Sequence, residues 1–167
     1  MIRYCALIGI VLLSACGYQL KQAYQLHPAL EKTHLQLPLT SALYQPLATA
    51  LTNQGIQLVE TESARAVMVI GQNRLVKEIQ SIGVNNRVQE YRLVYQLDFK
   101  LFIDGQLVLD SKTLQLSKDY AFDIGQITGA QTEERLLREQ LYEDMAQMIL
   151  RYLANQTIKS TDNNPAS

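Results

Sequence analysis

Alternating apolar and polar positions predict a long antiparallel hairpin over residues 90–122. In its first arm every second position is apolar: Tyr91, Leu93, Tyr95, Leu97, Phe99, Leu101 and Ile103. Successive side chains of a strand point to opposite faces, so this row lies against a core while most residues between them face water. An arm of about 13 residues at about 3.3 Å each is about 40 Å long, well above the usual strand.

The turn and the return arm of this hairpin can also be located. Asp104 and Gly105 suit a two-residue type I′ turn, because both central residues of that turn need a positive φ. The return arm carries Leu107, Leu109, Leu114, Leu116, Tyr120 and Phe122. Its apolar positions change parity after Leu109, so we expect a bulge or a twist near residues 110–113.

A third long strand precedes the hairpin. Residues 66–70 are apolar on both faces, and the pattern continues to Ile79 with Arg74, Lys77 and Glu78 interspersed. Gly71 within this run predicts a bulge or a close backbone approach. Residues 83–87 read as a turn, so the three strands are expected to form an antiparallel meander.

The segments before the third strand predict one helix and two short strands. Residues 41–54 have helical apolar spacing, with Pro46 expected in the first well-formed turn and Gly55 as a left-handed stop. Residues 35–39 alternate and end near a proline, so they predict a short strand. A brief strand is expected at residues 56–59.

A second helix closes the fold after the hairpin. Residues 125–129 read as a loop, and Thr128 and Gln131 fit a capping box. Glu133 and Glu134 are expected in the first turns, where the helix dipole favours acids. The apolar residues that follow recur at helical spacing: Leu137, Leu141, Met145, Met148, Ile149 and Tyr152. This stripe is expected to cover the sheet.

Composition limits the partners of the domain. The chain has 167 residues, 47% of them hydrophobic, and a formal net charge of -1, which suits one domain with a substantial core. A balanced charge argues against general nucleic-acid binding, so an anion site would have to be a local basic patch.

The N-terminus predicts a lipoprotein signal. Arg3 precedes an apolar run at residues 6–13 that is too short to span a bilayer, and the run ends in Leu-Ser-Ala-Cys, which resembles a bacterial lipobox. Residues 1–15 would then be cleaved and Cys16 would carry acyl chains that anchor the protein to a membrane. The alternative is an ordinary signal peptide with a chance cysteine.

Three consequences follow from a lipobox. Cys5 leaves with the signal and Cys16 is lipidated, so no disulfide is expected. Gly17 stands where lipoproteins retained at the inner membrane typically have Asp, so by this resemblance the address is the periplasmic face of the outer membrane. The mature domain would begin at Cys16 and extend to residue 156. Independently of the lipobox, the small and polar residues that follow predict a disordered tail at residues 157–167.

The sequence contains no recognisable catalytic, cofactor or metal motif. His27 and His34 lack partners at a metal-ligand spacing, and the pair Glu133 and Glu134 is read as helix capping rather than acid–base catalysis. We therefore expect neither an enzyme nor a bound cofactor or metal.

The basic residues of the three long strands and their turns allow two interpretations. They are Arg74, Lys77, Arg87, Arg92, Lys100, Lys112 and Lys118. One interpretation is a solvated sheet face with interleaved acids. The other is that some of them meet phosphates or carboxylates of a glycolipid, beside exposed apolar residues such as Ile82, Val84 and Val94.

Several of these segments together resemble the LptE family of lipopolysaccharide (LPS)-assembly lipoproteins. The resemblance rests on residues 13–20 (LSACGYQL), 90–93 (EYRL), 118–120 (KDY) and 133–134 (EE), in matching order over residues 16–156. It implies an α+β fold, a two-layer sandwich with two helices on one face of a mixed, mostly antiparallel sheet of about four strands in the order β-α-β-β-β-α.

The resemblance also implies a function. Members plug an LptD-type β-barrel, one-to-one, help that barrel to assemble, and assist the insertion of LPS into the outer leaflet. Contact with LPS is expected through basic residues, for which the candidates here are Arg87, Arg92, Lys77 and Lys118. A second contact region of the family, residues 124–132, has no Lys or Arg in this chain, and Lys118 is the nearest basic residue.

Two other functions remain open from the sequence. The chain could be a stand-alone lipoprotein that binds a ligand or acts as a chaperone. It could also be a tethered envelope hydrolase, for which Asp119 or Asp123 would have to be essential.

Overall fold

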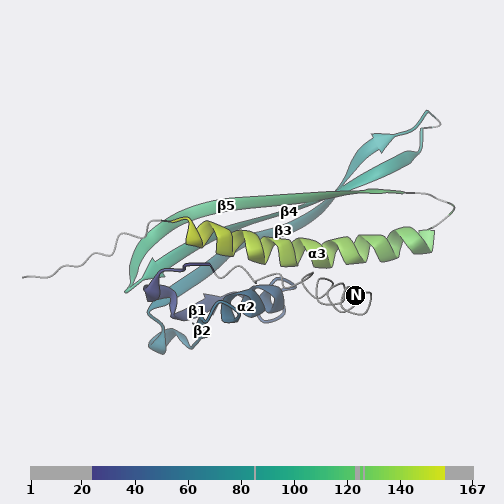
Figure 1. The fold of residues 1–167 in the computed structure, drawn as a ribbon. Helices are drawn as coiled ribbons and strands as arrows, with labels where there is room; N and C mark the ends of the chain where they lie inside the picture. Colours follow the sequence, from purple (N-terminus) through teal and green to yellow (C-terminus); the bar gives the residue numbers. More distant parts are fainter. Residues whose placement is uncertain (1–23, 85, 123–124, 126, 157–167) are drawn as a thin grey trace, which may run out of the picture.

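A five-stranded sheet carries two helices on one of its faces (Figure 1). The computed structural model describes residues 24–84, 86–122, 125 and 127–156. The predicted signal segment 1–15, the predicted lipidation site Cys16 and the predicted tail 157–167 lie outside the described residues. The expected α+β sandwich with both helices on one face is confirmed.

The elements follow one another from the edge of the sheet to the closing helix. In chain order they are η2 (Pro28–Leu30), β1 (Lys32–Gln36), α2 (Tyr44–Thr52), β2 (Gln57–Leu58), η3 (Thr61–Ser63), β3 (Ala66–Ile82), β4 (Val88–Ile103), β5 (Gln106–Ala121) and α3 (Ile127–Ala154). The spatial order of the strands is β2-β1-β3-β4-β5.

The sheet is mixed, as expected, with one strand more than the approximate four. β1 runs parallel to both β2 and β3, whereas β3, β4 and β5 form the predicted antiparallel meander. β1 pairs only with the first residues of β3, from Ala66 to Val69. The rest of β3 pairs with β4 alone, so the long β3, β4 and β5 strands extend beyond the short strands β1 and β2.

The predicted irregularities of the long strands are confirmed. Asp104 has φ 51° and Gly105 has φ 76°, as the two-residue turn requires. The β4–β5 register shifts where Phe99 faces Lys112 and Leu101 faces Leu109, so β5 has one extra residue near position 110. The β3–β4 register shifts between Ile70 and Asn73, at the predicted bulge around Gly71.

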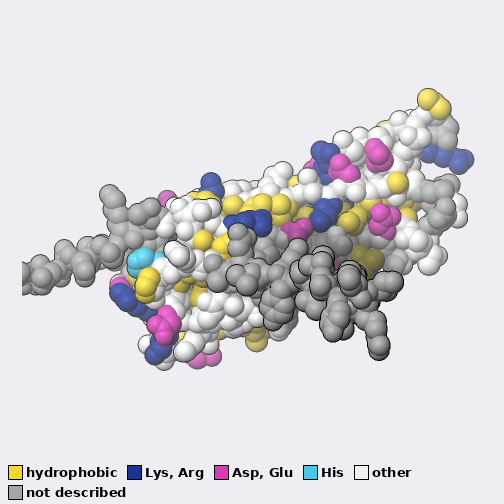
Figure 2. Space-filling model, viewed as in Figure 1, with side chains coloured by type: hydrophobic (Ala, Val, Ile, Leu, Met, Phe, Trp, Pro, Cys, Tyr) yellow, Lys and Arg dark blue, Asp and Glu magenta, His cyan; other side chains and the backbone are white. Residues whose placement is uncertain are grey.

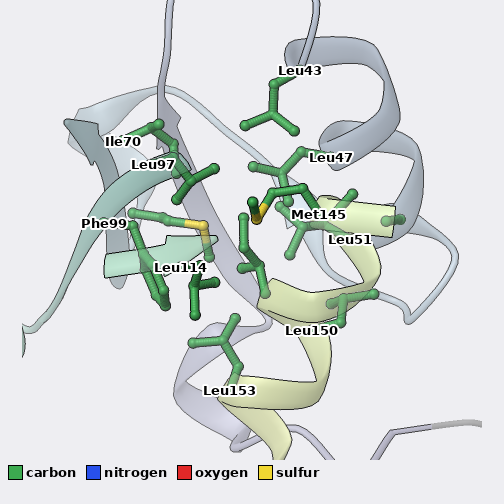
Figure 3. Close-up of a cluster of buried hydrophobic side chains, with 14 of the residues drawn as sticks. Leu43, Leu47, Leu51, Ile70, Leu97, Phe99, Leu114, Met145, Leu150 and Leu153 are labelled. Carbon is green, nitrogen blue, oxygen red and sulfur yellow. The ribbon is translucent and has the colours of Figure 1, made fainter. Parts of the chain in front are cut away.

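The core lies between the sheet and both helices (Figure 3). The inward row of β4 meets Leu47 and Leu51 of α2 and Met145 and Leu150 of α3 in one cluster of buried side chains. Tyr95 and Phe99 are fully buried there. The ring of Tyr95 packs edge-on against Tyr142 of α3 with ring centroids 5.0 Å apart.

Several element boundaries differ from the sequence prediction, and those of β1 and α3 differ in ways that have a visible cause. β1 ends at Gln36, because a backbone hydrogen bond from Leu37 to Leu35 turns the chain, and Leu39 is 74% exposed. α3 begins at Ile127, so Thr128 lies inside the helix rather than at a cap, and residues 127–129 are helical rather than loop. Within the first turns of the helix, the hydroxyl of Thr132 donates a hydrogen bond to the backbone carbonyl of Thr128.

α2 spans Tyr44–Thr52 and is shorter than the predicted 41–54, but the predicted roles of Pro46 and Gly55 are confirmed. Pro46 is the third residue of α2, and a proline is tolerated in a first turn because the amide hydrogens there have no partner inside the helix. Gly55 has φ 84°, the left-handed conformation that a glycine adopts without strain after a helix.

Candidate functional site

The two faces of the β3–β4–β5 sheet have different chemistry. The inward face of β4 presents the apolar row to the helices, and the outward face presents Arg92, Val94, Gln96, Asp98 and Lys100. In the described part of the chain both helices lie on the inward face (Figure 1). The outward face, which we call the bare face, is therefore a long polar surface.

Two carboxylates of the bare face accept hydrogen bonds from the neighbouring strand. Arg92 on β4 donates to both carboxylate oxygens of Asp119 on β5, at 2.6 and 2.8 Å. Thr113 Oγ1 donates to Asp98 at 2.6 Å. The hydrogen bond from Arg92 holds the pKa of Asp119 below its ordinary value. Asp119, one of the two acids named for a hydrolase, is thus paired with the Arg92 guanidinium on an open surface. The other, Asp123, lies outside the described residues.

On the inward face, one carboxylate collects donors from three elements. Glu134 of α3 accepts from Lys77 Nζ of β3 at 2.7 Å and from the hydroxyl of Tyr120 of β5 at 2.5 Å, both on Oε2. Arg138, one turn further along α3, donates to Oε1 from Nε at 3.1 Å and from Nη2 at 2.6 Å. We call Lys77, Tyr120, Glu134 and Arg138 the Glu134 cluster.

The donors of the Glu134 cluster keep its carboxyl ionised. Burial alone would raise the pKa of Glu134, but hydrogen bonds from Lys77, Tyr120 and Arg138 outweigh burial and lower the pKa to about 2. Burial and the bond to Glu134 raise the pKa of Tyr120, so its hydroxyl stays protonated and donates. The cluster contains two cations and one anion.

Aromatic rings lie beneath this cluster. Lys77 Nζ lies 4.0 Å from the ring centroid of Tyr91 and 5.5 Å from that of Tyr120. The Tyr91 ring in turn packs edge-on against Phe122, with centroids 5.2 Å apart. Ammonium groups are attracted to ring faces, so these rings help to hold Lys77 in place.

The β3–β4 hairpin ends in an exposed apolar tip. Ile82 is 58% exposed and Val84 is fully exposed at the turn. Arg87 is exposed in the same turn, where its carbonyl accepts from the amide of Gly83. Figure 2 shows hydrophobic side chains at this tip and mixed acidic and basic side chains along the strands behind it.

The four basic residues predicted to contact LPS are spread over three places. Strand register puts Lys77 and Lys118 in one row on the inward face, with Leu93 between them, which brings these two within about 10 Å across two strand spacings. Lys118 pairs with Asp144 of α3 at 2.9 Å. Arg92 lies on the opposite, bare face, and Arg87 lies at the hairpin turn.

Sequence reasoning missed the role of Glu134. It was expected to support the first turn of a helix, but it is the eighth residue of α3 and its main partner is Lys77, 57 positions earlier in the chain. The available signal was the spacing of Glu134 and Arg138, an acid four residues before a base on a helix.

Within the described ranges no three His, Cys, Asp or Glu side chains form a group that could hold a metal ion. No helix of the described chain is long and apolar enough to cross a bilayer.

Comparisons with solved structures reveal several lipoproteins of similar fold. A minor lipoprotein from Acinetobacter baumannii has 24% identity and a TM-score of 0.64, covering 75% of this chain and 91% of its own. Lipoprotein B from Nitrosomonas europaea has 22% identity and a TM-score of 0.70, covering 83% and 90%. Rare lipoprotein B from Shewanella oneidensis has 20% identity and a TM-score of 0.65, covering 74% and 93%. At these identities the likeness shows the fold.

The family follows from the sequence itself. No curated protein matches the chain as a relative. A family model described as "LptE: Lipopolysaccharide-assembly" matches residues 29–153, from η2 to the last turn of α3, and so includes both faces of the sheet and the Glu134 cluster. This chain belongs to the LptE lipopolysaccharide-assembly family.

Proposed function

We propose that this protein is an outer-membrane lipoprotein, anchored through acyl chains on Cys16, that plugs an LptD-type β-barrel. In this role it helps the barrel to assemble and assists the insertion of LPS into the outer leaflet. The function is structural rather than catalytic. The family match over residues 29–153 is the observation that carries the proposal.

The bare face gives this proposal a physical basis. A barrel that conducts a polar headgroup has a polar lumen, and a plug inside it needs a surface that forms hydrogen bonds and ion pairs. The bare face supplies such groups along strands of 16 and 17 residues, and a shallow hollow of about 220 Å³ on it is lined by side chains of all three long strands. The opposite face of the sheet is covered by α2 and α3 (Figure 1), so it is not available for contact with a barrel wall.

A refolding titration tests this function. The purified LptD-type barrel protein is refolded in detergent with increasing amounts of the full-length lipoprotein. We expect the yield of folded barrel to rise and to level off at one equivalent of lipoprotein. Equal yields with and without the lipoprotein would contradict the proposal.

Contact with LPS is a separate part of the proposal and is tested by a separate substitution. Arg87 is exposed at the hairpin turn beside the apolar tip, an arrangement that suits an anionic lipid. We expect Arg87→Glu to weaken LPS binding without altering thermal stability, as measured by titration of LPS and by thermal unfolding. An unchanged titration would remove Arg87 from the binding surface.

A further inference from the structure

The Glu134 cluster has the composition of an anion-binding site that is already filled. One carboxylate accepts from an ammonium, a phenol and both nitrogens of one edge of a guanidinium. Such convergence of donors from β3, β5 and α3 on a single anion is what phosphate sites in proteins use. Here the anion belongs to the protein.

The charge of the cluster fits a phosphate better than a carboxylate. Lys77 and Arg138 carry two positive charges and Glu134 supplies one negative charge. A phosphomonoester near pH 7 carries about 1.5 to 2 negative charges and has three terminal oxygens. It could therefore neutralise both cations and accept from Tyr120 as well.

Three of the four side chains of the cluster are accessible from solvent, whereas Tyr120 is 4% exposed. The side chain of Glu134 is 19% exposed, that of Lys77 is 32% exposed and that of Arg138 is 37% exposed. Because a glutamate side chain has three rotatable bonds, its carboxylate can leave the donors without movement of the helix backbone. Ile79, two residues beyond Lys77 on the same face of β3, is 58% exposed and offers an apolar contact beside the site.

We propose that Lys77, Arg138 and Tyr120 form a phosphomonoester-binding site that Glu134 occupies as a built-in competitor. A ligand phosphate displaces the Glu134 carboxylate and takes over its hydrogen bonds. The source of the phosphate is either a lipid headgroup or a free phosphate compound. With a lipid source this inference rests on the proposed function, because the phosphates of LPS are then the ligand.

The test compares two charge-neutral variants of the full-length protein in a phosphate-free maltoside detergent. Glu134→Gln removes the competing charge, and Glu133→Gln makes the same change at the neighbouring exposed residue, which is the matched control. Inorganic phosphate is titrated by calorimetry. We expect Glu134→Gln to bind phosphate about tenfold more tightly than the wild type, or more, because a like charge within hydrogen-bond range is removed. Equal affinities of Glu134→Gln and Glu133→Gln would overturn the inference.

Two further variants examine the donors. Tyr120→Phe keeps the ring and removes one hydroxyl, so in the Glu134→Gln background it should lower phosphate affinity about fivefold. If Glu134→Gln fails to fold, Lys77→Gln in the wild-type background takes its place and should lower the residual phosphate affinity about tenfold or more. In either case, a phosphate affinity that the donor substitution leaves unchanged would overturn the assignment of the donors.

A last arm identifies the source of the phosphate. LPS micelles are titrated before and after enzymatic dephosphorylation. A gain for Glu134→Gln that depends on the LPS phosphates identifies a lipid headgroup, and a gain seen with inorganic phosphate alone identifies a free phosphate compound. Because the barrel takes no part in these titrations, a negative result leaves the barrel proposal untouched, and a failed refolding titration leaves the phosphate result untouched.

Discussion

The C-terminal half of α3 presents six side chains to the core that are at most 1% exposed: Leu141, Met145, Ala146, Ile149, Leu150 and Leu153. In the N-terminal half, over residues 128–140, only Ala130 is buried, and Glu134, Leu137 and Arg138 are partly exposed. The first half is thus held chiefly by directional contacts to charged groups, and the second half by loss of apolar surface from water.

The difference between the halves has a consequence for binding. Apolar burial forms without a bound counter-ion, so the C-terminal half should stay docked when one anion in solution replaces another. Contacts to a carboxylate can be exchanged for contacts to another anion. The Glu134 cluster is therefore a part of the helix–sheet interface that a ligand can enter.

The largest expected effect comes from the apolar half. Leu141→Ala leaves a cavity at a fully buried position, so we expect a loss of about 2–5 kcal/mol in the free energy of unfolding, measured with denaturant. Gln140→Ala, at the exposed neighbouring residue, is the control and should change stability by less than about 0.5 kcal/mol. Equal losses for both variants would contradict the packing described for α3.

An intermediate and local effect is expected from the ionic half. Glu134→Gln replaces charge-assisted hydrogen bonds by weaker ones, with an expected loss of about 1–3 kcal/mol. Amide hydrogen exchange should accelerate in residues 128–140 more than in residues 141–153, because the core contacts of the second half are untouched. Uniform acceleration along α3 would mean that the two halves open as one unit.

The same variant gives a pH dependence with a defined sign. The pKa of Glu134 is about 2 in the folded protein against 4.5 as the ordinary value, so its contribution to stability is complete above about pH 5 and is lost as pH falls towards 2. The stability difference between wild type and Glu134→Gln should therefore shrink over that window in thermal unfolding. A constant difference would show that the charge of Glu134 does not carry the effect.

The smallest expected effect lies on the bare face. Arg92→Gln breaks the bidentate pair with Asp119, but exposed ion pairs contribute little to stability. We expect a melting temperature close to that of the wild type and well above that of Leu141→Ala. A melting temperature as low as that of the core variant would mean that the bare face also stabilises the fold.

The sequence predicted the long hairpin well because its causes are local. Alternation fixes which row of β4 is buried, and Asp104 and Gly105 fix the turn, so strands, turn and bulge could be placed without knowledge of the rest of the fold. The short strand β1 was placed about three residues too late, because its boundary depends on pairing with β3 rather than on its own pattern.

The candidate site could be predicted only in part because it depends on register. The basic residues of the strands were identified, but register separates Arg92 from Lys77 and Lys118 by placing them on opposite faces of the sheet. Glu134 was interpreted from its distance to a helix start, whereas its partners Lys77 and Tyr120 come from two strands that only the fold brings together.

Co-purification from the membrane tests whether this protein occupies a β-barrel. The tagged full-length protein is purified from detergent-solubilised outer membranes under mild conditions, and the mass and stoichiometry of the accompanying protein are determined. We expect a large β-barrel protein of the LptD type at one copy per copy of the lipoprotein. A lipoprotein recovered alone, with the barrel left in the flow-through, would contradict it.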